Sequence, residues 1–194
     1  MKQRKPNRLD EYDYSQPGHY FVTLCTKDRT HWFGEIKDGE IVLNEYGSIL
    51  QKQWNWLPEQ YPYVELDVFA VMPNHFHGVI AIVGDGCIVG GGRDRPLRKT
   101  KPLPELIGAF KTTSSKLIHQ AGGNEFHWQR SFYDHIVRDE LSLNRIREYI
   151  VNNPAQWDSD VENTQNVRAE DDAYYVHGAA RTQAPPHWVS KGLT

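Results

Sequence analysis

The chain has 194 residues, of which 39% are hydrophobic, so we expect one domain with an ordinary buried core. No run approaches the roughly 18 apolar residues that cross a bilayer, and no apolar segment follows the basic N-terminus, so we expect a cytoplasmic protein without a membrane partner. The two cysteines have no metal-type spacing and no disulfide framework. The net charge of −3 excludes a uniformly basic chain, yet residues 91–120 carry a net +5 and residues 31–90 a net −6.

The first part of the chain predicts a strand, a hairpin and a helix. Residues 19–26 are aromatic and β-branched, which is typical of a strand, and residues 33–44 predict a hairpin that turns at its Asp-Gly pair. Asn44 can cap the helix that follows, which ends before Pro58. Its apolar residues recur at helical spacing: Tyr46, Ile49, Leu50, Trp54 and Leu57.

The rest of the chain predicts two more strands, a helix, a strand and a final helix. In this order they span residues 64–72, 75–83, 103–120, 127–137 and 142–153. Residues 84–101 are too rich in glycine and charge to form a core element, so we expect a basic loop there. Pro154 ends the last helix, and residues 158–194 predict an extended tail.

Without the hairpin, the order βαββαβ plus one helix predicts an α+β, ferredoxin-like antiparallel sheet. We expect two helices on one face, an open second face, an added N-terminal hairpin and an added C-terminal helix. The domain should span residues 1–157. Many unrelated chemistries use this fold, so function has to come from the site.

The stretch VMPNHFHGVIAI, residues 71–82, places two histidines in an otherwise apolar strand. Side chains alternate along a strand, so His75 and His77 share one face. The opposite face carries Phe76, Gly78, Ile80 and Ile82. On an open sheet face the two imidazoles could coordinate a divalent cation, or they could simply be hydrogen-bonded within the sheet. With no cysteine nearby, a metal with open coordination positions is favoured over structural zinc.

The stretch REYIVNNPAQW, residues 147–157, predicts a second cluster. Tyr149 and Asn153 are four residues apart on a helix, which places a phenol beside an amide that can offer its oxygen to a metal. A phenol has a pKa near 10 and is a poor nucleophile unless an adjacent cation favours the phenolate. The alternative is a half-buried tyrosine and an asparagine that ends the helix.

These residues carry a family resemblance. MPNHFHG resembles the His-hydrophobic-His signature of the HUH single-tyrosine transposases, and REYIVNNP resembles their nucleophile helix. Within that superfamily the chain resembles the REP-associated tyrosine transposases over residues 4–157, through RKPNRLDEYDYSQPGHYFVTLCTKDR, FGEI, LNEYG and WQRSFYDHIVRDELSLNRIREYIVNNP. The resemblance implies a ferredoxin-like domain that cleaves and rejoins single-stranded DNA near REP-type hairpins.

The resemblance also implies a role for each site residue. Tyr149 becomes the nucleophile, which forms a 5′-phosphotyrosine and frees a 3′-hydroxyl, and His75, His77 and Asn153 become the metal ligands. Some members of the wider family carry a glutamine at the position of Asn153. Imidazole, amide and phosphate oxygen donors suit Mg²⁺ or Mn²⁺. The protein would be a monomer or a homodimer, with its site completed within one chain or across two.

Six cations are candidates for binding the DNA backbone, and they are Arg93, Arg95, Arg98, Lys99, Lys111 and Lys116. Four of them lie in the loop at residues 84–101, whose glycines hold no fixed geometry, so we expect it to contribute affinity without sequence choice. The alternative is a solvated loop. Trp32, Trp128 and Tyr133 could stack on unpaired bases, or could be core aromatics.

Two other functions stay open. A hairpin-binding protein that has lost cleavage would need no metal and tyrosine, whereas this chain retains all four site residues. A metal-dependent phosphodiesterase that uses water would need a general base beside the ion, and neither motif contains a carboxylate, although Glu148 adjoins one. A covalent protein–DNA product would distinguish the three functions.

Overall fold

The computed structural model describes residue 9 and residues 11–84, 100–160 and 162–163. Most of the basic loop and of the expected tail lie outside these residues, so for those parts of both segments the expectations stay predictions. Within the described ranges, no helix is both long and apolar enough to cross a membrane.

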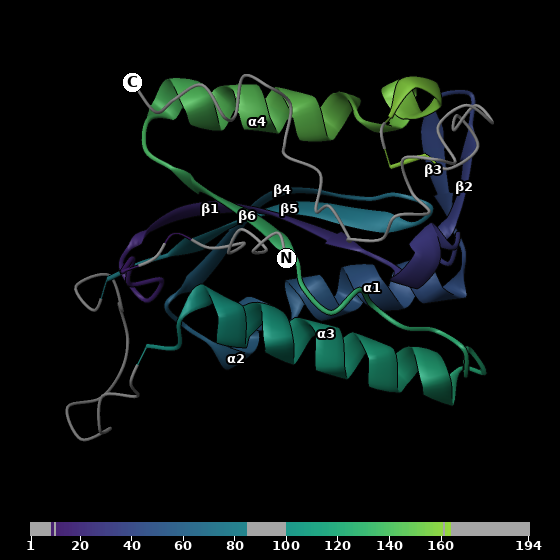
Figure 1. Ribbon diagram of the computed structural model, residues 1–194, viewed down its shortest axis with the longest axis horizontal. Coiled ribbons are helices and arrows are strands. Elements are labelled where there is room, and N and C mark those ends of the chain that lie inside the picture. The colour runs from purple at the N-terminus through teal and green to yellow at the C-terminus, as the bar shows by residue number, and fades with distance from the viewer. Residues whose placement is uncertain (1–8, 10, 85–99, 161, 164–194) are drawn as a thin grey trace, which may run out of the picture.

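Four antiparallel strands form the central sheet, in the spatial order β4-β5-β1-β6. They are β1 (Gly18–Cys25), β4 (Val64–Val71), β5 (His75–Ile82) and β6 (Tyr133–Val137). Helices α1 (Glu45–Asn55) and α3 (Leu103–Gln120) contact each other and cover one face of this sheet (Figure 1). The predicted ferredoxin-like fold is therefore confirmed.

The predicted hairpin forms a separate two-stranded sheet beside the central one. Its strands are β2 (Gly34–Lys37) and β3 (Glu40–Leu43). Asp38 and Gly39 both adopt positive φ, at 52° and 78°, which is the geometry that an Asp-Gly hairpin turn requires. A short helix, α2 (Leu57–Gln60), follows α1.

The main core lies between the sheet and the helices α1 and α3. Asn44 caps α1 as predicted, because its Oδ1 accepts a hydrogen bond from the backbone N–H of Gly47 at 3.0 Å. The apolar face of β5 packs here, with the Phe76 ring 4.7 Å from Trp54 and 5.4 Å from Phe110. This packing anchors β5, the strand that carries the two histidines.

The second face of the sheet is not open as expected, because α4 (Glu140–Asn152) lies across it (Figure 1). The Asp139 side chain caps α4 by accepting a hydrogen bond from the backbone N–H of Ser142 at 2.7 Å. A smaller apolar cluster joins α4 to the sheet through Phe21, Val79, Leu143, Ile146 and Ile150. The expectation failed because this helix follows the βαββαβ unit and has an apolar stripe of its own to bury.

Strand β4 contains an irregularity between Leu66 and Phe69, where its pairing with β5 shifts. Val64 and Leu66 pack in the main core, whereas Val68 and Ala70 pack beneath α4. The alternation of these four residues within the strand at 64–72 predicts that they share one face. This prediction is wrong, because a bulge inserts one residue and reverses the alternation.

The bulge also anchors α4. Asp67, within it, accepts hydrogen bonds from Arg147 Nε at 3.0 Å and Nη2 at 2.6 Å. Arg147 holds the pKa of the Asp67 carboxyl below its usual value, so the pair stays ionised. The contact fixes the helix that carries Tyr149 over the sheet.

Two predicted boundaries differ from the structure. The strand expected at residues 127–137 is regular only in β6, and the residues before it make a single bridge, from Trp128 to Thr26. Beyond α4, the 3₁₀ helix η3 (Pro154–Ser159) continues the packed chain. Glu162 and Asn163 are buried, so the packed region extends past the expected domain end at residue 157.

Candidate metal and tyrosine site

His75 and His77 lie side by side on the face of β5 that α4 covers. Their ring centroids are 4.5 Å apart, and the two residues are 0% and 3% exposed. Burial lowers the pKa of His75 to about 3 and places that of His77 well below its usual value. Both rings are therefore neutral at physiological pH, which is the form that binds metals.

The hydrogen bonds of Asn74 determine which nitrogen of His75 carries the proton. Asn74 Nδ2 donates to the backbone carbonyls of Arg29 at 3.1 Å and Glu162 at 2.7 Å. Its Oδ1 lies 2.8 Å from His75 Nδ1 and can only accept, so Nδ1 holds the ring proton. The lone pair is therefore on Nε2, the nitrogen left available to a cation.

His77 is held by two hydroxyl groups. Its Nδ1 lies 2.8 Å from Thr23 Oγ1, on the neighbouring strand β1, and its Nε2 lies 3.3 Å from the Tyr149 hydroxyl. The Tyr149 ring comes from α4 and packs against both His77 and Phe21. The structure thus brings the predicted tyrosine to the predicted histidines.

The surroundings of Tyr149 favour the protonated phenol. Burial raises its pKa above the usual value, and the negative charge of Asp160 raises it further. Asn153, one helical turn away, lowers the pKa through a hydrogen bond. A nearby cation would oppose the first two effects, because positive charge favours the phenolate.

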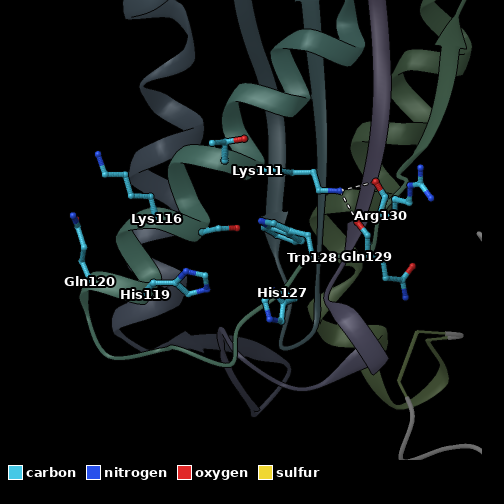
Figure 2. A pocket seen from close by; sticks show the side chains of 10 residues that line it. Lys111, Lys116, His119, Gln120, His127, Trp128, Gln129 and Arg130 are labelled. Carbon is cyan, nitrogen blue, oxygen red and sulfur yellow. Dashed lines mark hydrogen bonds between the residues drawn. The ribbon is translucent and has the colours of Figure 1, made fainter.

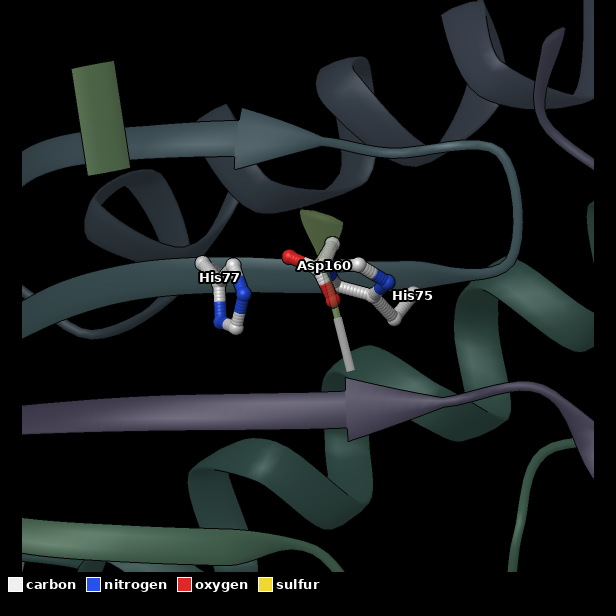
Figure 3. Close-up of side chains that lie close together, drawn as sticks. All are labelled: His75, His77 and Asp160. Carbon is white, nitrogen blue, oxygen red and sulfur yellow. The ribbon is translucent and has the colours of Figure 1, made fainter. Parts of the chain in front are cut away.

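Asp160 joins the site from beyond η3, and sequence reasoning missed it. Its carboxylate and the ring nitrogens of His75 and His77 lie within 4.8 Å of one another (Figure 3). Burial raises the pKa of Asp160, while His77 and the hydrogen bond from Asn153 Nδ2, 2.8 Å long, oppose that rise. The available signal was an acidic residue seven positions after Asn153, in a segment that we expected to be a tail.

Asn153 is buried beside this cluster, at the end of α4. Within the described residues, neither Asn153 Oδ1 nor His75 Nε2 has a hydrogen-bond partner. The Asn153 amide nevertheless lies close enough to His75 to favour its charged form. Buried acceptors are unfavourable unless a hydrogen-bond donor or a cation satisfies them, and a cation could satisfy both of these atoms at once.

The donor set therefore fits a divalent cation. Two imidazoles, the Asp160 carboxylate and the Asn153 amide oxygen could hold one, and mixed nitrogen and oxygen ligands suit Mn²⁺ or, with fewer nitrogen contacts, Mg²⁺. Glu148, by contrast, is exposed on α4 and is not part of the cluster.

The segment after η3 is fixed where Asp160 enters the site. Glu162 forms a buried salt bridge with Arg29, and Asn163 Nδ2 donates to the Trp157 carbonyl at 3.0 Å. Cys25 Sγ donates to Glu162 Oε2 at 3.4 Å, and burial raises the pKa of its thiol to about 11. Cys25 is thus a protonated, structural residue.

The candidate DNA-binding residues divide into three groups. Arg93, Arg95, Arg98 and Lys99 lie outside the described residues. Lys111 and Lys116 lie on α3, away from the face that carries the histidines. Trp32 and Trp128 pack against the main core, and Tyr133 against the smaller cluster beneath α4, so all three contribute to packing.

Comparison with known proteins gives the family. No protein-family model matches the chain. An uncharacterized protein of Haemophilus influenzae is 35% identical over 167 residues, covering 81% of this chain and 91% of that protein. A second Haemophilus influenzae protein, named "Putative REP-associated tyrosine transposase", is 25% identical over 145 residues, covering 74% of each.

A solved structure shares the fold. It is of a REP-associated tyrosine transposase bound to a REP hairpin, and it matches with a TM-score of 0.51 at 18% identity, over 81% of this chain and 74% of that one. Both the second Haemophilus influenzae protein and the solved one are named as transposases, and the chain shares the fold of the solved one. The chain belongs to the REP-associated tyrosine transposase family.

Proposed function

We propose that the protein cleaves and rejoins single-stranded DNA near REP-type hairpins, with Tyr149 as the nucleophile. The observation that carries the proposal is the contact between the Tyr149 hydroxyl and His77 Nε2, 3.3 Å apart, beside a buried cluster whose donor set fits a cation. The hairpin substrate is inferred from the relatives, one of which was solved with a REP hairpin bound. The proposed setting is the cytoplasm, with the protein a monomer or homodimer.

A divalent cation, Mg²⁺ or Mn²⁺, would offset the charge of the phosphodiester and favour the phenolate of Tyr149. His75, His77, Asn153 and Asp160 are the residues that would hold it. Asn74 would keep His75 in the tautomer that presents Nε2. Arg147, by holding α4 to the sheet, would keep Tyr149 above the histidines.

In the proposed reaction the Tyr149 oxygen bonds to phosphorus while the bond from phosphorus to the 3′-oxygen breaks. The phenol loses its proton to solvent, and a cation held by the cluster would favour this loss. The released 3′-oxygen takes up a proton and becomes a hydroxyl. The ester energy is kept in the phosphotyrosine, so attack by another 3′-hydroxyl rejoins the strand without a nucleotide cofactor.

Asp160 also bears on the alternative of a phosphodiesterase that uses water. The lack of a carboxylate in the two sequence motifs counted against it, but the structure places one beside the histidines. The product separates the two reactions, because a water-using enzyme leaves no DNA on the protein. A hairpin-binding protein without cleavage would leave the DNA intact.

The test is incubation of the protein with single-stranded hairpin DNA and Mn²⁺, followed by denaturing electrophoresis. We expect a covalent adduct with the parent protein and none with Tyr149→Phe, which should still bind the DNA because only the phenolic oxygen is lost. Tyr133→Phe is the matched control, since Tyr133 lies on the same sheet face with its ring 6.5 Å from Phe21. An adduct that survives Tyr149→Phe, or a DNA-bearing peptide that contains Tyr133, would contradict the assignment.

A further inference from the structure

A groove of about 720 Å³ runs along α3, on the side of the sheet opposite the histidines. Its wall is one side of α3, and its other edge is the segment at residues 127–130 that leads towards β6 (Figure 2). The side chains that give it its chemistry are Lys111, Lys116, His119, His127, Trp128 and Arg130.

The groove is positively charged. Three of its side chains are cations, two are imidazoles, and none of its lining residues is acidic. Lys116 and Arg130 are both exposed to solvent, and they lie on opposite sides of the groove. Because the chain as a whole carries a net charge of −3, this concentration of positive charge is a local feature of the surface.

The groove has a fixed shape. Lys111 Nζ donates to the backbone carbonyls of Gln129 at 2.5 Å and Arg130 at 3.3 Å, which ties α3 to the opposite edge. Burial lowers the pKa of Lys111 to about 8, so it remains largely cationic at neutral pH. The Trp128 indole N–H donates to Ser114 Oγ at 3.2 Å and holds the ring at the groove. Cations beside an aromatic ring are typical of single-strand binding surfaces.

One edge of the groove is bonded directly to the strand end at the candidate site. The Lys27 N–H donates to the His127 carbonyl at 2.7 Å, and the Gln129 N–H to the Cys25 carbonyl at 2.9 Å. Cys25, in turn, pairs with His75 across β1 and β5. The groove and the histidine cluster are therefore on opposite sides of the same end of β1.

We propose that this groove binds the phosphate backbone of a single-stranded DNA segment that continues around the end of β1 into the histidine and tyrosine site. The inference rests on the proposed function and adds the path of the strand. Lys116 and Arg130 contact phosphates, while Lys111 supplies charge from a fixed position. The groove contacts the phosphate backbone of the DNA and not the base edges, so it contributes affinity with little preference for sequence.

The experiment compares two double variants by fluorescence anisotropy. K116Q/R130Q removes two groove cations, and K37Q/K52Q removes the same charge from exposed positions elsewhere. The probes are a labelled hairpin with a long single-stranded flank and the same hairpin without the flank. Titrations in EDTA over a range of salt concentrations measure binding without cleavage.

We expect K116Q/R130Q to weaken binding of the flanked hairpin severalfold. The slope of the logarithm of the binding constant against the logarithm of the salt concentration should become shallower by about 1.4, the value for two phosphate contacts on a single strand. Binding of the hairpin without a flank should be unchanged, and K37Q/K52Q should match the parent with both probes. Equal losses in both double variants, an unchanged salt slope, or the same loss with both probes would overturn the proposal. The last result would place the hairpin stem in the groove.

The groove proposal and the proposed cleavage can fail independently of each other. A parent protein that binds the flanked hairpin through the groove but forms no adduct in Mn²⁺ would overturn the proposed cleavage and leave the groove assignment standing. A parent protein that forms the adduct while K116Q/R130Q binds normally would overturn only the groove assignment.

Discussion

Replacing Asn74 by alanine tests whether a fixed histidine tautomer prepares the site for a cation. The substitution removes the acceptor for His75 Nδ1–H and the donors to the carbonyls of Arg29 and Glu162. Each buried hydrogen bond contributes about 1 kcal/mol, so we expect a loss of about 3 kcal/mol in the free energy of unfolding. Freed from Asn74, the ring can place its proton on either nitrogen, and we expect Mn²⁺ affinity to fall about 10-fold to 100-fold.

Urea unfolding in EDTA measures the stability loss, and calorimetric titration with Mn²⁺ measures affinity in the folded protein. Asn44→Ala is the matched control, because it removes the α1 cap, which makes no hydrogen bond to either histidine, at a cost of about 1 kcal/mol. That control should bind Mn²⁺ like the parent protein. If Asn74→Ala loses stability yet binds Mn²⁺ within about threefold of the parent, which is less than 1 kcal/mol in binding free energy, the tautomer argument is refuted.

Two further predictions concern charge in the same site. The pKa of His75 is about 3 in the folded protein, and that of an unfolded histidine is about 6.5. Between these two values the unfolded state binds the proton more readily, so in EDTA the free energy of unfolding should fall as the pH drops from about 6.5 towards 3. The loss from His75 alone should reach about 2 kcal/mol by pH 5, and urea midpoints should show a smaller drop for His75→Asn than for the parent protein. Asp160→Asn removes the anionic ligand and should weaken Mn²⁺ binding about tenfold or more in calorimetry. The control is Asp158→Asn, which changes an exposed residue of η3 and should leave the affinity unchanged. Equal Mn²⁺ affinities for the two variants would remove Asp160 from the ligand set.

Local patterns were sufficient to predict most of the fold. Alternation correctly placed His75 and His77 on the face opposite Phe76 and Ile80, because β5 is a regular strand without a bulge. The cap at Asn44 and the Asp-Gly turn were predictable for a similar reason, since each depends on backbone chemistry within a few residues.

The features that sequence missed depend on contacts between distant segments. The bulge in β4 reverses the alternation of that strand, and it is held by Arg147, 80 residues away from Asp67. The position of α4 across the sheet, and of Asp160 beside the histidines, likewise follows from tertiary packing. No spacing rule connects Asp160 to His77, because the link between them is the fold itself.

The two faces of β5 explain how one strand can support both the core and the candidate site. Gly78 faces the main core, where a Cβ atom would lie 2.7 Å from the Trp54 ring and 2.8 Å from Phe76, so the backbone of the strand packs closely against the core. Because the backbone is fixed from that side, His77 on the other face is held in place before any ligand arrives. Rigid support of this kind favours a metal and nucleophile geometry that loops alone would hold less accurately.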